Sequence, residues 1–261
     1  MEAEIVFFLL RKSASEPPER IASGGLAEIM KPALPDQELL KQKLLTMASH
    51  AESAVQRSVA ALTSRDYDLA LRVRGEDEVI DRYEVQVDKL AIELLAQAPP
   101  MNELRRIAVT MKISQNLERV GDEATKIAKR ARDLSQEAPL RLMIDIPPLA
   151  NLVLRMLKSA LDAFVNQDPV AARALIPEDK EIDLLNNRIQ CQLADYMMEN
   201  REAITRCLHM MVVAKSLERI ADHAKNIAEE VVFLCEAQDI RHSGGSGSET
   251  PGKESTRALK S

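Results

Sequence analysis

The sequence predicts an all-α protein made of two tandem, pseudo-symmetric three-helix bundles. The first observation behind this prediction is an internal repeat, since residues 117–128 read LERVGDEATKIA and residues 217–228 read LERIADHAKNIA. A repeat at a fixed offset indicates that one structural unit occurs twice. The second observation is composition: the 261-residue chain has no Trp, only 3% aromatic residues, and an abundance of Leu, Ala, Glu, Lys and Arg, as packed helices do. The third is the order of the helical segments.

The first half of the chain contains three helical segments. Apolar residues recur at three- and four-residue steps over 36–63, which predicts an amphipathic helix with Asp36 as its N-cap. A second segment covers 66–98 and ends before a Pro-Pro pair, because the residue before a proline disfavours helix. A third segment covers 102–134, with Asn102 as its expected N-cap.

The second half repeats this order after a break. Residues 136–147 contain two prolines and are predicted to be a linker. Helix is expected again over 149–166, over 168–198 with an Asp-Pro start, and over 200–236 with Asn200 as the N-cap. The pattern is therefore three helices, a linker and three helices.

These segments divide the chain into five parts. We expect an N-terminal extension at 1–36, a first repeat at 37–135, a linker at 136–147, a second repeat at 148–237 and a disordered tail at 238–261. The tail is rich in Ser, Gly, Thr, Lys and Glu, and a segment without an apolar face cannot offset the entropy of ordering.

The middle helix of each repeat carries a breaker at the same place. At an offset of 102 residues, Gly75 aligns with Pro177. Glycine and proline are different residues that both interrupt helices. We therefore expect a shared kink just before the first acidic pair of each repeat.

Four pairs of carboxylates, each spaced four residues apart, lie on the second and third helices of the two repeats. That spacing places both members of a pair on one side of a helix, about one turn apart. Within a repeat the two pairs are about equally distant from the turn joining their helices, so we expect them to meet at one height. They lie off the apolar stripes, which predicts exposure at the bundle surface. The pairs are Asp77 and Asp81, Glu118 and Asp122, Asp179 and Asp183, and Glu218 and Asp222.

Such clusters would offer a cation oxygen ligands only, which suit Mg, Ca, Mn or Fe. The competing interpretation is that these acids form the solvated face of amphipathic helices, but the match between repeats favours a site. Arg119 and Arg219 flank the acids and are either ion-pair partners or groups that help to hold an anion near the metal. His223 follows Asp222 directly, so we expect it behind the ligands or on the surface.

Composition excludes several classes of function. A net charge of −6 argues against general nucleic-acid binding. Three cysteines without a C-x-x-C pair fit a reduced compartment. No apolar run approaches the length of a membrane span. We find no Gly-rich phosphate loop, Ser-His-Asp pattern or Cys-His pattern, so we expect no enzymatic activity.

The two copies, LERVGD and LERIADHAKNIAE, resemble the paired signatures of the PhoU family, and the resemblance spans residues 37–237. It implies a cytoplasmic accessory protein of the high-affinity phosphate ABC transporter. Such proteins restrain phosphate-starvation signalling by linking the transporter to a membrane sensor histidine kinase. Because the family's acidic motifs bind multinuclear iron or zinc clusters in some members, the resemblance implies this role for the eight carboxylates, with manganese and magnesium as further candidate ions. We expect a homodimer that contacts membranes only through its partners.

Two other functions compete with this interpretation. A ferritin-like di-metal oxidase would need Glu-x-x-His on two helices, and no His of this sequence has Glu three residues before it. A helical adaptor without metal would bind basic partner surfaces through its acidic faces. Metal content of the purified protein separates the adaptor from the metal-binding regulator.

Overall fold

The computed structural model describes residues 35–241, and these residues form helices joined by short loops, with no strand among them. The first half contains four α-helices, and the second half contains four more together with two short 3₁₀ segments. In chain order they are α2 (Pro35–Ser64), α3 (Tyr67–Gly75), α4 (Asp77–Leu95), α5 (Met101–Ser135), α6 (Ile146–Asn166), α7 (Pro169–Leu175), η1 (Ile176–Glu178), α8 (Asp179–Glu199), η2 (Arg201–Ala203) and α9 (Ile204–Glu236).

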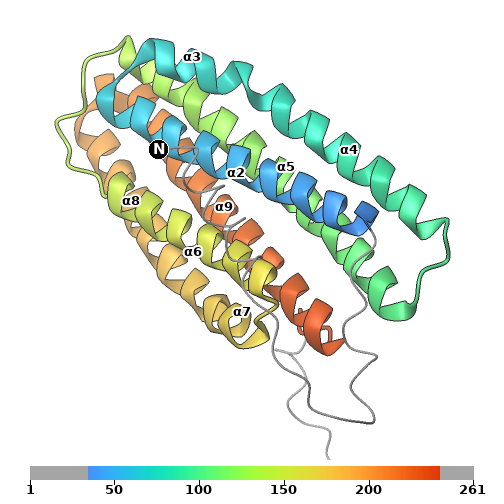
Figure 1. Cartoon of the computed structure of the whole chain (residues 1–261). Helices are drawn as coiled ribbons and strands as arrows, with labels where there is room; N and C mark the ends of the chain where they lie inside the picture. The colour runs from blue at the N-terminus through green and yellow to red at the C-terminus, as the bar shows by residue number, and fades with distance from the viewer. Residues whose placement is uncertain (1–34, 242–261) are drawn as a thin grey trace, which may run out of the picture. The chain divides into compact units, whose positions relative to one another are not determined.

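The helices form two copies of one arrangement, which confirms the predicted all-α fold with its tandem repeats (Figure 1). In the first copy α2 and α5 pack together, and α3 and α4 lie along them as the broken middle helix. In the second copy α6 and α9 take the places of α2 and α5, while α7 and α8 form the broken middle helix. Within residues 35–241, no helix is both long enough and apolar enough to cross a membrane.

The predicted kinks are present in both middle helices. In the first repeat α3 ends at Gly75 and α4 begins at Asp77, with Glu76 between the two helices. In the second repeat Pro177 lies within η1, between α7 and α8. Each break comes directly before the first acidic residue of a pair, so the kink sets where Asp77 and Asp179 stand relative to the third helix.

Both middle helices also begin in the same way. Asp66 caps α3 by accepting a hydrogen bond from the Leu69 amide at 2.8 Å, and Asp168 caps α7 by accepting from two amides. The residue before each cap has a left-handed backbone, with φ of 56° at Arg65 and 51° at Gln167. The left-handed residue turns the chain sharply into the next helix, and the Asp then satisfies free amides of its first turn.

Of three other cap predictions, two were wrong, and Asn200 occupies the N-cap position of η2 without a side-chain cap. Asn102 lies inside α5, which begins at Met101 after Pro100. Asn200 makes no cap hydrogen bond and instead donates its side-chain amide to the Tyr196 carbonyl at the end of α8. Asp36 lies inside the first turn of α2 rather than before it. Asn102 and Asp36 have the residue types that favour caps, but each already lies within its helix.

The helix α6 begins three residues earlier than the expected start at 149. Its first turn contains Pro147 and Pro148. Prolines are tolerated there because the first amides of a helix have no intrahelical partner to lose. The expected N-terminal extension and tail fall mainly on residues 1–34 and 242–261, which lie outside the described residues.

One apolar core runs through both repeats. It contains fully buried Leu117 of α5 and its counterpart Leu217 of α9, together with side chains from α2, α6 and α8. The helices α5 and α9 pack directly against each other, as do α2 and α6. The two repeats are therefore joined by shared interior packing as well as by the linker.

The helices α5 and α9 cross antiparallel at the signature repeats. Contacts between them step in opposite directions along the chain, from Lys112 with Glu230, through Asn116 with Asn226, to Glu123 with Arg219. This arrangement sets each signature beside the other. The acidic pairs of α5 and α9 meet the middle helices α4 and α8, respectively.

Candidate functional site

The first acidic cluster joins α4 and α5. Burial raises the pKa of Asp77, and the neighbouring charges of Asp81 and Asp122 raise it further. Asp81 and Asp122 are exposed, while Asp77 and Glu118 are half-buried. The structure thus brings the two predicted pairs of this repeat together across the two helices.

A fifth carboxylate, Glu84, belongs to this cluster and was missed from the sequence. Burial raises the pKa of Glu118, and Asp122 and Glu84 raise it further. Burial also raises the pKa of Glu84, with contributions from Asp88 and Asp81. Glu84 has no acidic counterpart in the second repeat, because Asn186 stands at the equivalent position, 102 residues later. Its spacing of three residues from Asp81 was the available signal.

The second cluster joins α8 and α9 and is less exposed than expected. The structure brings Asp179, Asp183, Glu218 and Asp222 together, but Asp179 is 5% exposed and Glu218 is 8% exposed. The expectation that all eight carboxylates lie at the surface was therefore wrong for these two. Helix α8 packs against α9 and covers the faces that carry them.

Two lysines of α9 compensate the buried acids of the second cluster. Lys225 donates a 2.7 Å hydrogen bond to Asp179, and Lys215 pairs with Glu218 at 2.6 Å. The second carboxylate oxygen of Asp179, Oδ1, is nevertheless buried without a hydrogen-bond donor in the described part of the chain. A buried carboxylate oxygen without a donor is costly, so Asp179 Oδ1 has unused capacity for a cation.

The other two acids of this cluster, Asp222 and Asp183, are repelled by neighbouring carboxylates. Burial raises the pKa of Asp222, and Glu218 and Asp179 raise it further. Burial likewise raises the pKa of Asp183, followed by the charge of Asp179. A bound cation would relieve this repulsion in both clusters.

The chemistry of the clusters fits a hard metal ion, but their side chains do not converge. Within residues 35–241, no three His, Cys, Asp or Glu side chains are placed to hold one ion together. The oxygen ligands, the repulsion between the carboxylates and the unpaired Asp179 Oδ1 are what favour a metal there.

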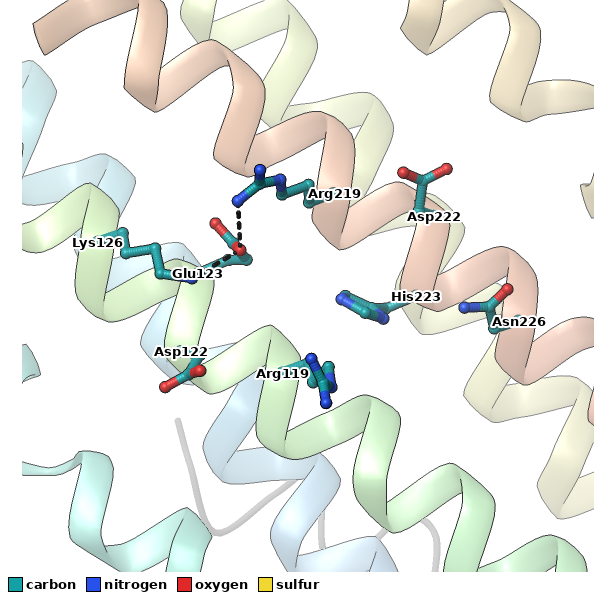
Figure 2. A pocket seen from close by; sticks show the side chains of 8 residues that line it. All are labelled: Arg119, Asp122, Glu123, Lys126, Arg219, Asp222, His223 and Asn226. Carbon is teal, nitrogen blue, oxygen red and sulfur yellow. Dashed lines mark hydrogen bonds and ion pairs between the residues drawn. The ribbon is translucent and has the colours of Figure 1, made fainter.

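A pocket of about 500 Å³ lies between the two clusters, where α5 crosses α9 (Figure 2). The residues that line it come from equivalent positions of the two signatures. They are Arg119, Asp122, Glu123 and Lys126 of α5, and Arg219, Asp222, His223 and Asn226 of α9.

A buried carboxylate anchors one side of this pocket. Glu123 is 5% exposed and accepts from Lys126 at 2.9 Å and from Arg219 at 3.3 Å. Burial acts to raise the pKa of Glu123, but hydrogen bonds from Lys126 and Ser216 outweigh it and lower that pKa overall. Arg219 is thus an ion-pair partner, one of the two roles that the sequence suggested for it.

The other side of the pocket contains His223 and Arg119. His223 is half-buried and lies beside Asn116, with 3.0 Å between Nδ1 and the amide oxygen. Burial and the positive charge of Arg119 lower the pKa of His223. Arg119 is exposed and forms no ion pair within residues 35–241.

Comparison with known proteins agrees with this arrangement. The model of the PhoU domain matches the chain twice, over residues 44–131 and 146–231. The accessory protein PhoU homologue of the phosphate-specific transport system from Pseudomonas putida is 38% identical over 209 residues, which cover 79% of this chain and 82% of that protein. The corresponding Escherichia coli protein is 32% identical, covering 80% of this chain and 87% of that protein.

Solved structures show the same fold. The crystal structure of PhoU from Pseudomonas aeruginosa is 36% identical and aligns with a TM-score of 0.76, covering 78% of this chain and 98% of that one. The phosphate transport system regulatory protein PhoU from Streptococcus pneumoniae is 25% identical and aligns with a TM-score of 0.73, covering 78% of this chain and 96% of that one.

Fold and site together define a tandem-repeat helical-bundle protein with one paired acidic cluster in each repeat. The family model matches both repeats, and the curated relatives cover most of the chain. The chain belongs to the PhoU family.

Proposed function

We propose that the protein is a non-enzymatic, cytoplasmic accessory regulator of phosphate transport. In this proposal it restrains phosphate-starvation signalling by linking a phosphate ABC transporter to a sensor histidine kinase. The observation that carries the proposal is family membership over both repeats, at 32–38% identity to relatives named phosphate-specific transport system accessory proteins. The homodimer expected from the sequence belongs to the same proposal, and light scattering of the full chain tests it.

The proposal includes metal at the two acidic clusters. Iron, zinc, manganese or magnesium would neutralise the clustered carboxylates and so permit contact with a partner surface. The first site would use Asp77, Asp81, Glu118 and Asp122, and the second Asp179, Asp183, Glu218 and Asp222. Repulsion within each cluster supports the need for a cation.

A ferritin-like oxidase is the weaker alternative. Its ligands face the interior of a single bundle and include histidines. Here the two acidic clusters lie where a middle helix meets a third helix, and no His of the sequence follows a Glu by three residues. The acids therefore fit a binding surface better than an oxidase centre.

Deletion of residues 37–237 in the organism that encodes the protein tests the regulatory role. We expect starvation genes to be expressed in abundant phosphate, with excess phosphate uptake, and we expect the full chain supplied on a plasmid to restore repression. Normal repression in the deletion strain, with no second family member in the genome, would contradict the proposal.

Partner contact is tested by recovering the tagged full chain with solubilised membranes from phosphate-replete cells. We expect the Asp81→Lys, Asp122→Lys double variant to lose transporter and kinase, because both side chains are exposed and belong to the first cluster. Glu78→Lys is the matched control, since Glu78 is exposed on the same helix but forms no ion pair within the described residues. Equal recovery of partners by all three proteins would exclude the first cluster as the docking surface.

A further inference from the structure

The pocket between α5 and α9 has more hydrogen-bond donors than its own carboxylate uses. Arg119, Lys126 and Arg219 line the pocket, and each has an exposed side chain. Glu123 Oε1 receives a single N–H from Arg219 and another from Lys126. A guanidinium has five N–H donors and an ammonium has three. Arg219 therefore keeps four donors, Lys126 keeps two and Arg119 keeps all five.

The orientation of the acids leaves the centre of the pocket positive. In Figure 2, Asp122 and Asp222 point away from the gap between the helices, toward the sides that carry the acidic clusters. Glu123 lies in the gap beside Arg219, and its side chain is almost fully buried. The lining thus contains three cations and three acids, but only the carboxylate of Glu123 lies in the gap, so the cations outnumber the carboxylates there.

Two uncharged side chains complete the pocket. The amide nitrogen of Asn116 donates to the Lys112 carbonyl, so its oxygen is the acceptor that faces α9. That oxygen lies 3.3 Å from the Asn226 amide nitrogen and 3.0 Å from His223 Nδ1. Asn226 and His223 are held in place by this contact, and the His223 ring extends into the gap (Figure 2).

We propose that this pocket binds a compact oxyanion with two negative charges, of the chemical class of inorganic phosphate, between Arg119, Lys126 and Arg219. A guanidinium group can donate two parallel hydrogen bonds to two oxygens of such an anion, and a lysine adds a compact positive charge. Glu123 acts as the buried anchor that holds Lys126 and Arg219 in the pocket while their other donors face the ligand. The negative charge of a dianion is attracted by the three cations that line the gap.

This inference is independent of the proposed link to a transporter and a kinase, because it rests only on the side chains at the crossing. The pocket shares Asp122 and Asp222 with the acidic clusters, but the three cations proposed to hold the anion belong to neither cluster. The purified protein could therefore bind phosphate whether or not deletion of the protein in cells releases the starvation genes.

The test is titration calorimetry of the full chain with inorganic phosphate, after dialysis against EDTA and at constant ionic strength set with chloride. We expect one phosphate per chain. Arg119→Gln should weaken binding roughly tenfold to a hundredfold, the worth of a charge-assisted contact. This variant leaves both hydrogen bonds to Glu123 Oε1 in place, because Arg119 takes no part in them.

Two further variants separate the pocket from general charge effects. Lys126→Gln should weaken binding, whereas Lys129→Gln should not, since Lys129 is exposed one turn further along α5 and does not line the pocket. Glu123→Gln should strengthen binding, because it removes the negative charge but keeps an acceptor for both cations. A misfolded variant would bind phosphate more weakly, so stronger binding by Glu123→Gln cannot be explained by misfolding.

Three outcomes would overturn the proposal. The first is that the EDTA-treated protein does not bind phosphate at millimolar concentration, whether or not binding appears after metal is added back. The second is equal weakening by Lys126→Gln and Lys129→Gln. The third is unchanged affinity in Arg119→Gln, shown by circular dichroism to be folded.

Discussion

Glu123 of α5 and Arg219 of α9 are joined across the boundary between the two repeats, with 3.3 Å between Oε1 and Nη1. Lys126 reaches the same carboxylate oxygen from within α5, at 2.9 Å. The carboxylate is buried, whereas both cations are about half exposed. Either cation alone can still compensate the buried charge, and this shared role has a measurable consequence.

We predict that Arg219→Gln and Lys126→Gln are non-additive in stability. Each single change should lower the free energy of unfolding by less than about 1 kcal/mol, because one cation remains beside Glu123. The double change leaves a buried carboxylate with no cation and should cost about 3 kcal/mol. Urea unfolding of the four proteins measures the coupling, and the cycle repeated on Glu123→Gln is the control. Additive losses on the parent protein would show that the carboxylate finds another partner.

A second prediction concerns the close approach of α4 to α5 at Gly121. A Cβ added there would lie 2.8 Å from Ile80 Cδ1, and Ile80 is buried. Gly121→Ala should therefore cost about 1 kcal/mol, since overpacking outweighs the gain in helix propensity. In the background of Ile80→Val, which lacks that methyl group, the same change should be neutral or stabilising. Thermal unfolding of the four proteins tests this, and an equal cost in both backgrounds would mean that the backbones, not Ile80, resist the methyl group.

A third prediction concerns pH and the second acidic cluster in the absence of metal. The pKa of Asp222 is raised above 3.8 by burial and neighbouring acids. Since the native state then disfavours the ionised form, the penalty is absent well below pH 4 and grows as the pH rises through the raised pKa. Asp222→Asn should match the parent protein at low pH and become more stable by about 0.5 kcal/mol at neutral pH.

Chemical unfolding in EDTA between pH 3.5 and 7.5 measures this difference. Glu181→Gln is the control, because Glu181 is exposed on α8 outside the cluster. A stability difference that falls with rising pH would reverse the sign and show that ionised Asp222 stabilises the native state. Adding a metal that binds the cluster should remove the advantage of Asp222→Asn.

A fourth prediction is that the two clusters take up metal separately. Asp122→Ala should lower metal bound by the first cluster and leave the second unchanged, and Asp222→Ala should do the reverse. Elemental analysis after incubation with iron, zinc or manganese measures the stoichiometry, and Glu78→Ala should retain the parent value. No uptake by the parent protein under aerobic or anaerobic conditions would refute the metal sites. The folded state should survive Asp122→Ala, because Asp122 is exposed and its loss leaves no core cavity.

The helical architecture could be predicted because each cue occurs twice. Gly75 and Pro177 are chemically different, yet their common position indicated a break that either residue alone would have left ambiguous. The same duplication selected the carboxylates that the structure brings together. Local chemistry within one helix and its repeat was enough for these features.

The exposure of individual acids could not be predicted in this way. Periodicity places Glu218 opposite the apolar stripe of its own helix, but it does not reveal that α8 covers this face. Glu84 was missed because its counterpart Asn186 is not acidic. The pocket depends on the antiparallel crossing of α5 and α9, so Arg119 and Glu123 acquire their roles only from tertiary packing.

The continuity of the apolar core from one repeat into the other makes the duplicated halves inseparable. Ile113 of α5 and Val213 of α9 occupy equivalent positions, and both are fully buried in the same core. Either half alone would present such side chains to water, at a cost of about 25 cal/mol for each Å² laid bare. The two repeats therefore form one cooperative folding unit, in which each repeat covers the apolar side chains that the other would expose.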